Sequence, residues 1–285
     1  FTVTAARNMS MPTAIIVLIA LNWQNSEVVS WIAAGHAIGY FCYFIYLLVY
    51  SFMKTDFRFD WRAWPNRKVI AQLNEAVLYP SFGLAVRQSL RIAEGALASL
   101  IAPGGVASYY FAYRLISSLQ TIIGVSFATT KLPEMSRQAA RQDKRKYEKS
   151  LSSQIWQVSM ISLPISLFVL LFHTQIIQLL YGRGSFTVDS VAQTSQVLQV
   201  LGFNILFLSL IPTLNAALYA LQKYKLVWWN QVLNTATNLV LAWYLSKLYG
   251  IAGIAIALVL ATIASVIVQS FMLYYNRIVQ PIKEV

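Results

Sequence analysis

Residues 108–124 read SYYFAYRLISSLQTIIG, an aromatic and apolar stretch that contains a single arginine, Arg114. The stretch lies within a longer run, from Gly95 to Thr130, in which Arg114 is the only formally charged residue. About 20 apolar residues suffice for a helix to cross the hydrocarbon core of a bilayer. The run therefore predicts a membrane span that holds a permanent cation, with no carboxylate close to it in the sequence.

The composition of the whole chain agrees with a membrane protein. Of its 285 residues 58% are hydrophobic and 11% are charged, and its mean hydropathy is +0.57. Soluble globular domains carry roughly 25% charged residues, so this class is excluded. The single cysteine, Cys42, and the two distant histidines, His36 and His173, predict neither a disulfide framework nor a metal site.

Apolar runs bounded by charged residues or turn signals predict an all-α, polytopic transmembrane helical bundle with about eight spans. The predicted spans are 9–23, 31–53, 71–102, 106–130, 151–172, 193–218, 226–246 and 251–275.

The distribution of charge predicts the orientation of these spans. Most of the 22 basic residues lie in three connections between spans, which are 54–70, 131–150 and the short one that holds Lys223. If the spans alternate in direction, these connections all lie on one side of the membrane. The opposite side holds only Arg183 and Lys247. By the positive-inside rule the first side is cytoplasmic. The net charge of +12 is thereby explained by topology and by contact with anionic membrane lipids, and a nucleic-acid partner is excluded.

Arg114 is the first candidate for a functional role. An arginine at the centre of a membrane helix costs roughly 3 kcal/mol even on the lenient insertion scale, so it normally faces a bundle interior or a water-filled cavity. Its rigid fork of donors suits phosphate oxygens, which favours an anion-binding role. The structural alternative is that Arg114 snorkels, or that a carboxylate on another helix, such as Glu94, neutralises it.

Arg87, Arg91 and Glu94 follow the spacing i, i+4, i+7 and so share one face of the span 71–102. Arg91 and Glu94 can pair at i, i+3, which would leave Arg87 in excess. This face is expected to line a hydrophilic cavity together with Arg114 and Tyr113. An internal ion-pair network that only holds helices together is the alternative.

A second polar face lies on the span 226–246, which carries Asn230, Asn234, Thr237 and Asn238. Interhelical hydrogen bonds are its expected use, and an oxygen-rich cation site is the alternative. The sequence contains no Ser/His/Asp arrangement, HExxH motif or nucleophile elbow, and LLYGRGSFT (179–187) lacks the ending of a phosphate loop. We therefore expect no catalytic residues and no enzyme.

Three stretches, in order, resemble the MurJ/MviN family of lipid-linked oligosaccharide flippases, within the MOP transporter superfamily. They are VASYYFAYRLISSLQTIIGVSFATTKLPEMSR (106–137), LLYGRGSFTVDSVAQTSQVL (179–198) and LNAALYALQKYKLVWWNQVLNTATNLVL (214–241). The resemblance covers roughly residues 9–275 and implies the fifth to twelfth helices of a fourteen-helix protein. The chain begins with Phe1 rather than Met, and the resemblance implies that four helices precede it in the whole protein.

The resemblance also implies roles for individual residues. Arg114 matches an arginine with which the family holds the diphosphate of its lipid substrate in a central cavity. Some members bind sodium, and the matching positions here are Glu94, Asn234 and Asn238, whereas Leu258 stands where a hydroxyl residue is expected. No cofactor is expected, and Na⁺ or the membrane potential would supply the driving force.

The expected domain organisation follows from the same resemblance. Residues 1–55 would form the last two helices of an N-terminal bundle and 56–70 a basic cytoplasmic linker. Residues 71–275 would form a C-terminal six-helix bundle, and 276–285 a cytoplasmic tail or a link to further helices.

The resemblance implies a multi-pass flippase of the bacterial inner membrane that moves a polyprenyl-diphosphate-linked saccharide, the peptidoglycan precursor lipid II, by alternating access. The missing N-terminal helices would be needed for a complete cavity. The alternatives are an exopolysaccharide or O-antigen flippase of the same superfamily, a membrane-embedded glycosyltransferase, and a non-transporting scaffold.

Overall fold

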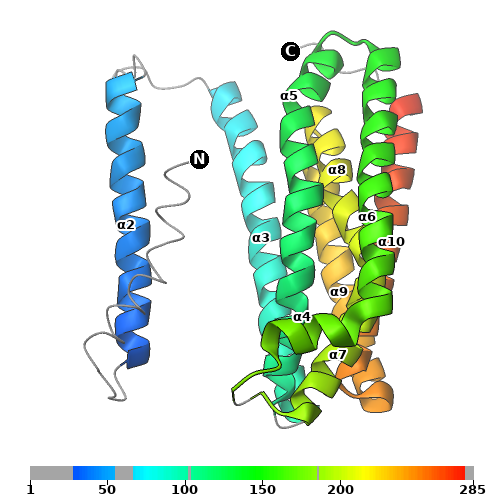
Figure 1. The fold of residues 1–285 in the computed structure, drawn as a ribbon. Helices are drawn as coiled ribbons and strands as arrows, with labels where there is room; N and C mark the ends of the chain where they lie inside the picture. The colour runs from blue at the N-terminus through cyan, green and yellow to red at the C-terminus, as the bar shows by residue number, and fades with distance from the viewer. Residues whose placement is uncertain (1–27, 55–66, 102–103, 185, 280–285) are drawn as a thin grey trace. The chain divides into compact units, whose positions relative to one another are not determined.

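The computed structural model describes residues 28–54, 67–101, 104–184 and 186–279. Within these ranges every element of regular structure is helical, which confirms the all-α prediction (Figure 1). The chain divides into two units, Phe1–Asn66 and Arg67–Val285, which we describe separately. The predicted domain boundaries inside these units remain predictions.

The described part of the first unit is α2 (Val28–Lys54), which covers the predicted span 31–53. Its mostly apolar side chains include large exposed residues such as Phe41 and Phe44. The predicted span 9–23 lies outside the described residues.

The second unit is a bundle of long helices (Figure 1). Its elements are α3 (Arg67–Ile101), α4 (Gly105–Gln120), the π-helix η1 (Thr121–Val125), α5 (Ser126–Ala140), α6 (Lys144–Tyr181), α7 (Val188–Phe203), α8 (Ile205–Ala220), α9 (Tyr224–Tyr249) and α10 (Ile251–Val279). α9 packs against both α10 and α3, α6 packs against α7 and α8, and α4 packs against α7.

The predicted span 106–130 belongs to one extended element formed by α4, η1 and α5, which together run from Gly105 to Ala140. η1 adds a wider turn in the middle of this element, where the sequence signals no break. Gly124 lies in η1 against α8, because a Cβ atom there would come within 2.6 Å of the Ser209 carbonyl oxygen. The absence of a side chain at Gly124 thus allows the two backbones to approach each other closely.

The predicted span 193–218 differs from expectation, since it forms two helices, α7 and α8, bent by 48°. The bend falls at Asn204, which is fully buried and whose Nδ2 donates to Thr262 Oγ1 of α10 at 3.2 Å. A buried amide that hydrogen-bonds to another helix fixes the position of the bend.

By length and composition, three helical elements in the described ranges are long and apolar enough to cross a membrane, or four if the bent pair α7–α8 is one span. They are the element Gly105–Ala140, α6 and the α10 segment Ile251–Tyr275. α3 and α9 do not meet this criterion, because their apolar sequences are interrupted by charged and amide side chains. The count of eight spans therefore remains a prediction.

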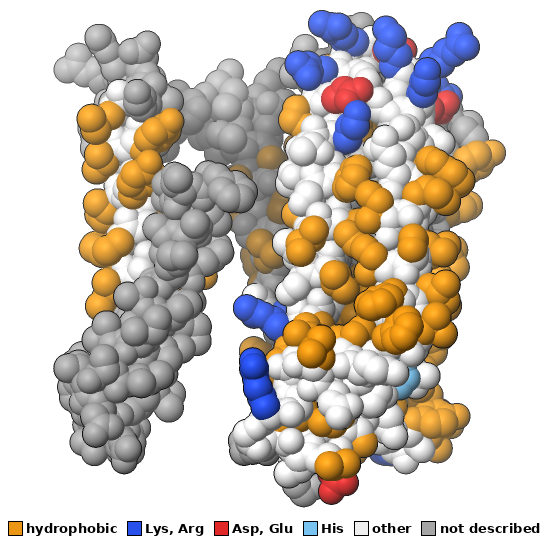
Figure 2. Space-filling view, in the orientation of Figure 1, with side chains coloured by type: hydrophobic (Ala, Val, Ile, Leu, Met, Phe, Trp, Pro, Cys, Tyr) orange, Lys and Arg blue, Asp and Glu red, His pale blue; other side chains and the backbone are white. Residues whose placement is uncertain are grey.

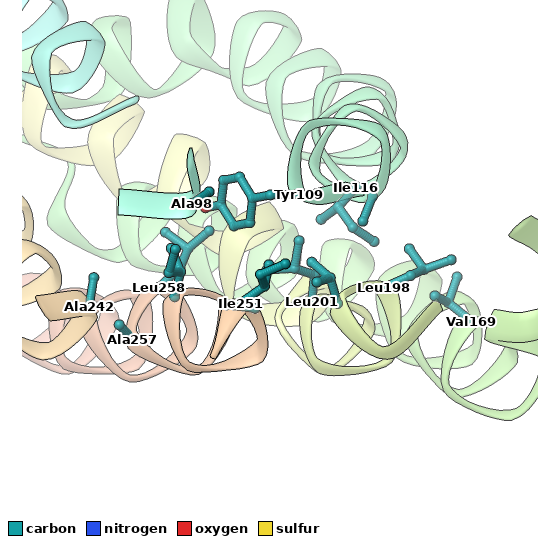
Figure 3. Packing of buried hydrophobic residues seen from close by; sticks show 14 of the residues in the cluster. Ala98, Tyr109, Ile116, Val169, Leu198, Leu201, Ala242, Ile251, Ala257 and Leu258 are labelled. Carbon is teal, nitrogen blue, oxygen red and sulfur yellow. The ribbon is translucent and has the colours of Figure 1, made fainter. Parts of the chain in front are cut away.

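Two clusters of buried apolar side chains hold the second unit together. The first joins the end of α3, the start of α4, α7 and the start of α10, and includes Tyr109, Ile116, Leu201 and Leu258 (Figure 3). The second joins the end of α5, the start of α6, the end of α8 and the start of α9, with Leu151 among its members. The clusters lie at opposite ends of the helices.

Polar side chains connect the helices between these clusters. Asn230 of α9 donates to Ser265 Oγ at 2.6 Å, and Asn234 of α9 donates to the Ala261 carbonyl oxygen at 2.8 Å. Such bonds contribute about 0.6 kcal/mol each in a membrane protein. The expectation that the asparagines of α9 form interhelical hydrogen bonds is confirmed at these two positions.

The basic residues of the connection between α5 and α6 gather at one end of the second unit, above a band of exposed apolar side chains (Figure 2). At the same end Lys225 of α9 pairs with Glu75 of α3 at 3.1 Å. Asp143 caps α6 by accepting from the Lys146 backbone N–H, and its bond to the Lys146 ammonium holds the pKa of that carboxyl below its usual value. The segregation of charge that the positive-inside rule requires is therefore present in the fold.

This arrangement predicts which ends of the helices face the cytoplasm. In a full-length protein in which Cys42 is replaced by Ser, a Lys144→Cys variant should be protected from an impermeant thiol reagent in intact cells. A Lys247→Cys variant should be labelled, since Lys247 lies at the opposite end of α9. Permeabilised cells, in which both variants should react, are the control, and labelling of Lys144→Cys in intact cells would overturn the orientation.

Candidate functional site

Arg114 lies in the middle of α4, on the side of the helix that faces away from the core of the second unit. Its side chain is exposed, whereas Ala112 and Ile116, its neighbours on the other side of the helix, are fully buried. The Arg114 carbonyl accepts hydrogen bonds from the hydroxyls of Ser117 and Ser118. Among the described residues no carboxylate lies within 4.0 Å of the Arg114 guanidinium. Its charge is therefore available to a ligand.

Glu94, the partner of Arg114 in the structural alternative, binds another residue. Its carboxylate is buried between α3 and α9, where Oε1 accepts from Asn238 Nδ2 at 3.0 Å. The ion pair that the i, i+3 spacing of Arg91 and Glu94 allows does not form, since no nitrogen–oxygen distance between them is within 4.0 Å. The physical reason is that Glu94 turns inward to the Asn238 amide while Arg91 turns toward α4.

Arg91 is held by aromatic residues of α4. Its guanidinium lies 4.9 Å from the centroid of the Tyr113 ring, and its backbone carbonyl accepts from the Tyr110 hydroxyl at 2.9 Å. Tyr109 extends this aromatic group, because its ring stacks on Tyr113 and meets Tyr110 edge to face. The Nε atom of Arg91 is buried and has no hydrogen-bond partner. A cation on an aromatic face gains about 0.5–2 kcal/mol, depending on how far it is desolvated.

Arg87 lies one turn before Arg91 on α3, and its side chain is exposed. The electrostatic environment of Arg87 includes Arg91, Tyr113 of α4 and Tyr219 of α8. The expectation that Arg87, Arg91 and Tyr113 line a hydrophilic cavity together with Arg114 stays a prediction. Tyr219, at the end of α8, was not identified from the sequence, because nothing in its local pattern marks it as a neighbour of α3.

The residues that match the family's sodium ligands are only partly brought together. Glu94 and Asn238 meet, and Asn238 Oδ1 is buried without a hydrogen-bond partner, so these two supply oxygen atoms that a hard cation could bind. The Asn234 amide donates instead to the Ala261 carbonyl oxygen. Leu258 packs in the first apolar cluster and offers no side-chain oxygen. The set fits a sodium ion incompletely, at two of its four positions.

A cavity of about 270 Å³ lies at the basic end of the second unit. Its lining residues are Glu134, Arg137, Gln138, Arg141, Asp143 and Lys146. From the sequence, the basic residues of this connection were attributed to topology and to contact with anionic membrane lipids. Both carboxylates of the cavity are engaged, Glu134 with Lys131 and Asp143 with Lys146.

Comparison with known proteins identifies the family. The family described as "Lipid II flippase MurJ" matches residues 5–285. The chain belongs to the MurJ family. A probable lipid II flippase MurJ of Thermotoga maritima is 27% identical over 236 residues, which is 83% of this chain and 47% of the relative. The chain thus spans about half the length of the curated relatives that it matches.

Solved structures show the same fold. A lipid II flippase MurJ in an inward closed conformation matches 95% of this chain and 55% of its own, with a TM-score of 0.73 at 18% identity. An inward-facing multidrug resistance MATE transporter of the MOP superfamily matches 97% of this chain and 63% of its own, with a TM-score of 0.78 at 15% identity. This MurJ-family chain is therefore a multi-pass membrane protein with the MOP transporter fold.

The contact between Glu94 and Asn238 predicts a structural role for Asn238. In the full-length protein, Asn238→Ala should lower the free energy of unfolding by about 1–3 kcal/mol, because it leaves the buried Glu94 carboxylate without this donor. Thermal unfolding in detergent, with and without NaCl at constant ionic strength, measures the effect. Thr237→Ala, one position away on α9, is the control. A loss of sodium-dependent stabilisation at unchanged stability without sodium would show instead that Asn238 is an ion ligand.

Proposed function

We propose that this chain is part of a flippase that moves lipid II, a polyprenyl-diphosphate-linked saccharide, across the bacterial inner membrane. Membership of the MurJ family and the fold of MOP transporters support the proposal. The observation that carries it is Arg114, a cation on an apolar helix without a carboxylate partner among the described residues. Such a residue is costly to keep in a membrane, and within spans it commonly marks the pathway of a substrate or ion.

In this proposal Arg114 binds the diphosphate of the substrate. A guanidinium donates two parallel hydrogen bonds to phosphate oxygens and stays protonated at every physiological pH. The exposed face of α4, on which Arg114 lies, would form part of the cavity wall. Lipid II would enter with its diphosphate at this wall, and the lipid tail would remain in the hydrocarbon.

The chain covers about half the length of its relatives, so half of the cavity is proposed to come from helices outside it. Transport would then proceed by alternating access, in which the bundle of α3–α10 moves relative to those helices. Because the transported molecule is released unchanged, no catalytic residue is required and the protein would not act as an enzyme.

The membrane potential or a sodium gradient is proposed as the driving force. Glu94 and Asn238 are the residues through which sodium would act, since they bring a carboxylate and an unpartnered amide oxygen together.

Substitution of Arg114 tests the proposal. In the full-length protein Arg114→Ala should abolish lipid II transport while expression and membrane insertion stay normal. Arg114→Lys keeps the charge but loses the two-pronged donor geometry, so it should retain partial transport at best. The measurement is lipid II flipping in cells depleted of the native flippase, and Arg183→Ala, in the turn after α6, is the matched control.

A structural role for Arg114 would give a different result. If Arg114 neutralised Glu94, the double variant Arg114→Ala with Glu94→Ala would recover transport, because removal of both charges of a pair leaves neither stranded. We expect the double variant to stay inactive, since Glu94 contacts Asn238 instead. Normal transport by Arg114→Ala would contradict the proposed function directly.

A further inference from the structure

Arg87 and Arg91 form a pair of like charges on α3 without an ion-pair partner among the described residues. They lie one helical turn apart, and no carboxylate comes within 4.0 Å of either guanidinium in the described ranges. Glu94, the acidic residue next along α3, is buried against Asn238. Two like charges at i, i+4 repel each other, and each is costly at membrane depth. An arrangement of this kind is stabilised when an anion binds between the two guanidiniums.

The Arg91 guanidinium is oriented before any ligand arrives. The Tyr113 ring supports its face at 4.9 Å, and the Tyr110 hydroxyl binds the backbone carbonyl of Arg91. A guanidinium that stacks on a ring directs its N–H donors outward in its own plane, where they can reach an acceptor. Arg91 therefore has a fixed support on α4.

Arg87 and Arg91 on α3 lie next to the face of α4 that carries Arg114. Tyr110, which binds the Arg91 carbonyl, and Arg114 lie at i and i+4 on α4, so they share one face of that helix. Arg87, Arg91 and Arg114 thus belong to neighbouring parts of one surface, formed by α3 and α4, which we call the α3–α4 wall. Phosphate and carboxylate oxygens are the acceptors that paired guanidiniums bind best.

We infer that Arg87 and Arg91, supported by Tyr113, form a second oxyanion subsite beside Arg114, which takes a phosphate or carboxylate group of the transported lipid-linked substrate. This inference rests on the proposed function, because it assumes that the wall formed by α3 and α4 faces the substrate. In this inference Arg87 and Arg91 contribute to the affinity for the substrate independently of Arg114.

Lipid II binding to the full-length protein in nanodiscs of uncharged lipid tests the subsite. The double variant Arg87→Gln with Arg91→Gln should weaken binding roughly tenfold or more, since a hydrogen bond to a charged group contributes about 1.5–3 kcal/mol. Arg87→Lys with Arg91→Lys should recover part of the loss. Arg183→Gln is the matched control and should bind as the wild type does.

Substitutions of Tyr113 test whether its aromatic ring positions the Arg91 guanidinium. Tyr113→Phe retains the ring and should keep the wild-type affinity for lipid II, whereas Tyr113→Leu should weaken it severalfold because Arg91 loses its aromatic face. Thermal unfolding of every variant separates loss of binding from loss of folding. Equal affinity of Tyr113→Leu and wild type would overturn the role of the ring in the subsite.

Two further results would overturn the inference. Wild-type lipid II affinity in the stably folded Arg87→Gln, Arg91→Gln double variant would show that the pair binds no part of the substrate. A double variant that loses only bound phosphatidylglycerol, measured by native mass spectrometry from discs that contain this lipid, would assign the pair to a bilayer headgroup. Arg114→Gln, measured in parallel, tests the proposed function independently, since either set of arginines can fail while the other still binds.

Discussion

The constraint on which the rest of this structure depends is the cost of an unneutralised guanidinium in an apolar environment. The second unit carries Arg87 and Arg91 on α3 and Arg114 on α4, and Glu94, a carboxylate close to Arg91 in sequence, is bound to Asn238. Glu94 therefore links α3 to α9, and none of these three guanidiniums has an ion-pair partner within 4.0 Å among the described residues. A fold that only required stable helices would not keep Arg114 in the middle of an apolar element.

The remainder of the second unit holds the α3–α4 wall in place. The two apolar clusters fix the ends of the helices, and the amides of α9 and the buried Asn204 connect α7, α9 and α10 between them. Gly124 permits α8 to contact η1 closely, on the α5 side of the arginine in the same extended element. The aromatic residues of α4 play a double role, since Tyr109 is buried in the apolar cluster while Tyr113 supports Arg91. The wall is consequently built on packed helices rather than on loops, which favours a defined geometry for a ligand.

Much of the fold could be predicted from the sequence because apolar runs and charged connections carry strong signals. Helices lie at seven of the predicted spans, and the basic connection between α5 and α6 lies at one end of the bundle, as the charge pattern indicates. The bend at Asn204 and the π-helix at Thr121–Val125 could not be predicted, since the contacts at these positions, with Thr262 of α10 and Ser209 of α8, join residues distant in sequence. The isolation of Arg114 was visible in the sequence, whereas the partner of Glu94 was not. Spacing at i, i+3 suggested Arg91, but the buried Asn238 amide, 144 residues away in sequence, is the donor that the fold brings to Glu94.

The most direct measurement of the central claim is an experimental structure of the full-length protein with a bound prenyl diphosphate. We expect the Arg114 guanidinium to contact phosphate oxygens at hydrogen-bond distance, roughly 2.7–2.9 Å. A structure in which Arg114 pairs with a carboxylate of the protein, while the diphosphate binds elsewhere, would contradict it.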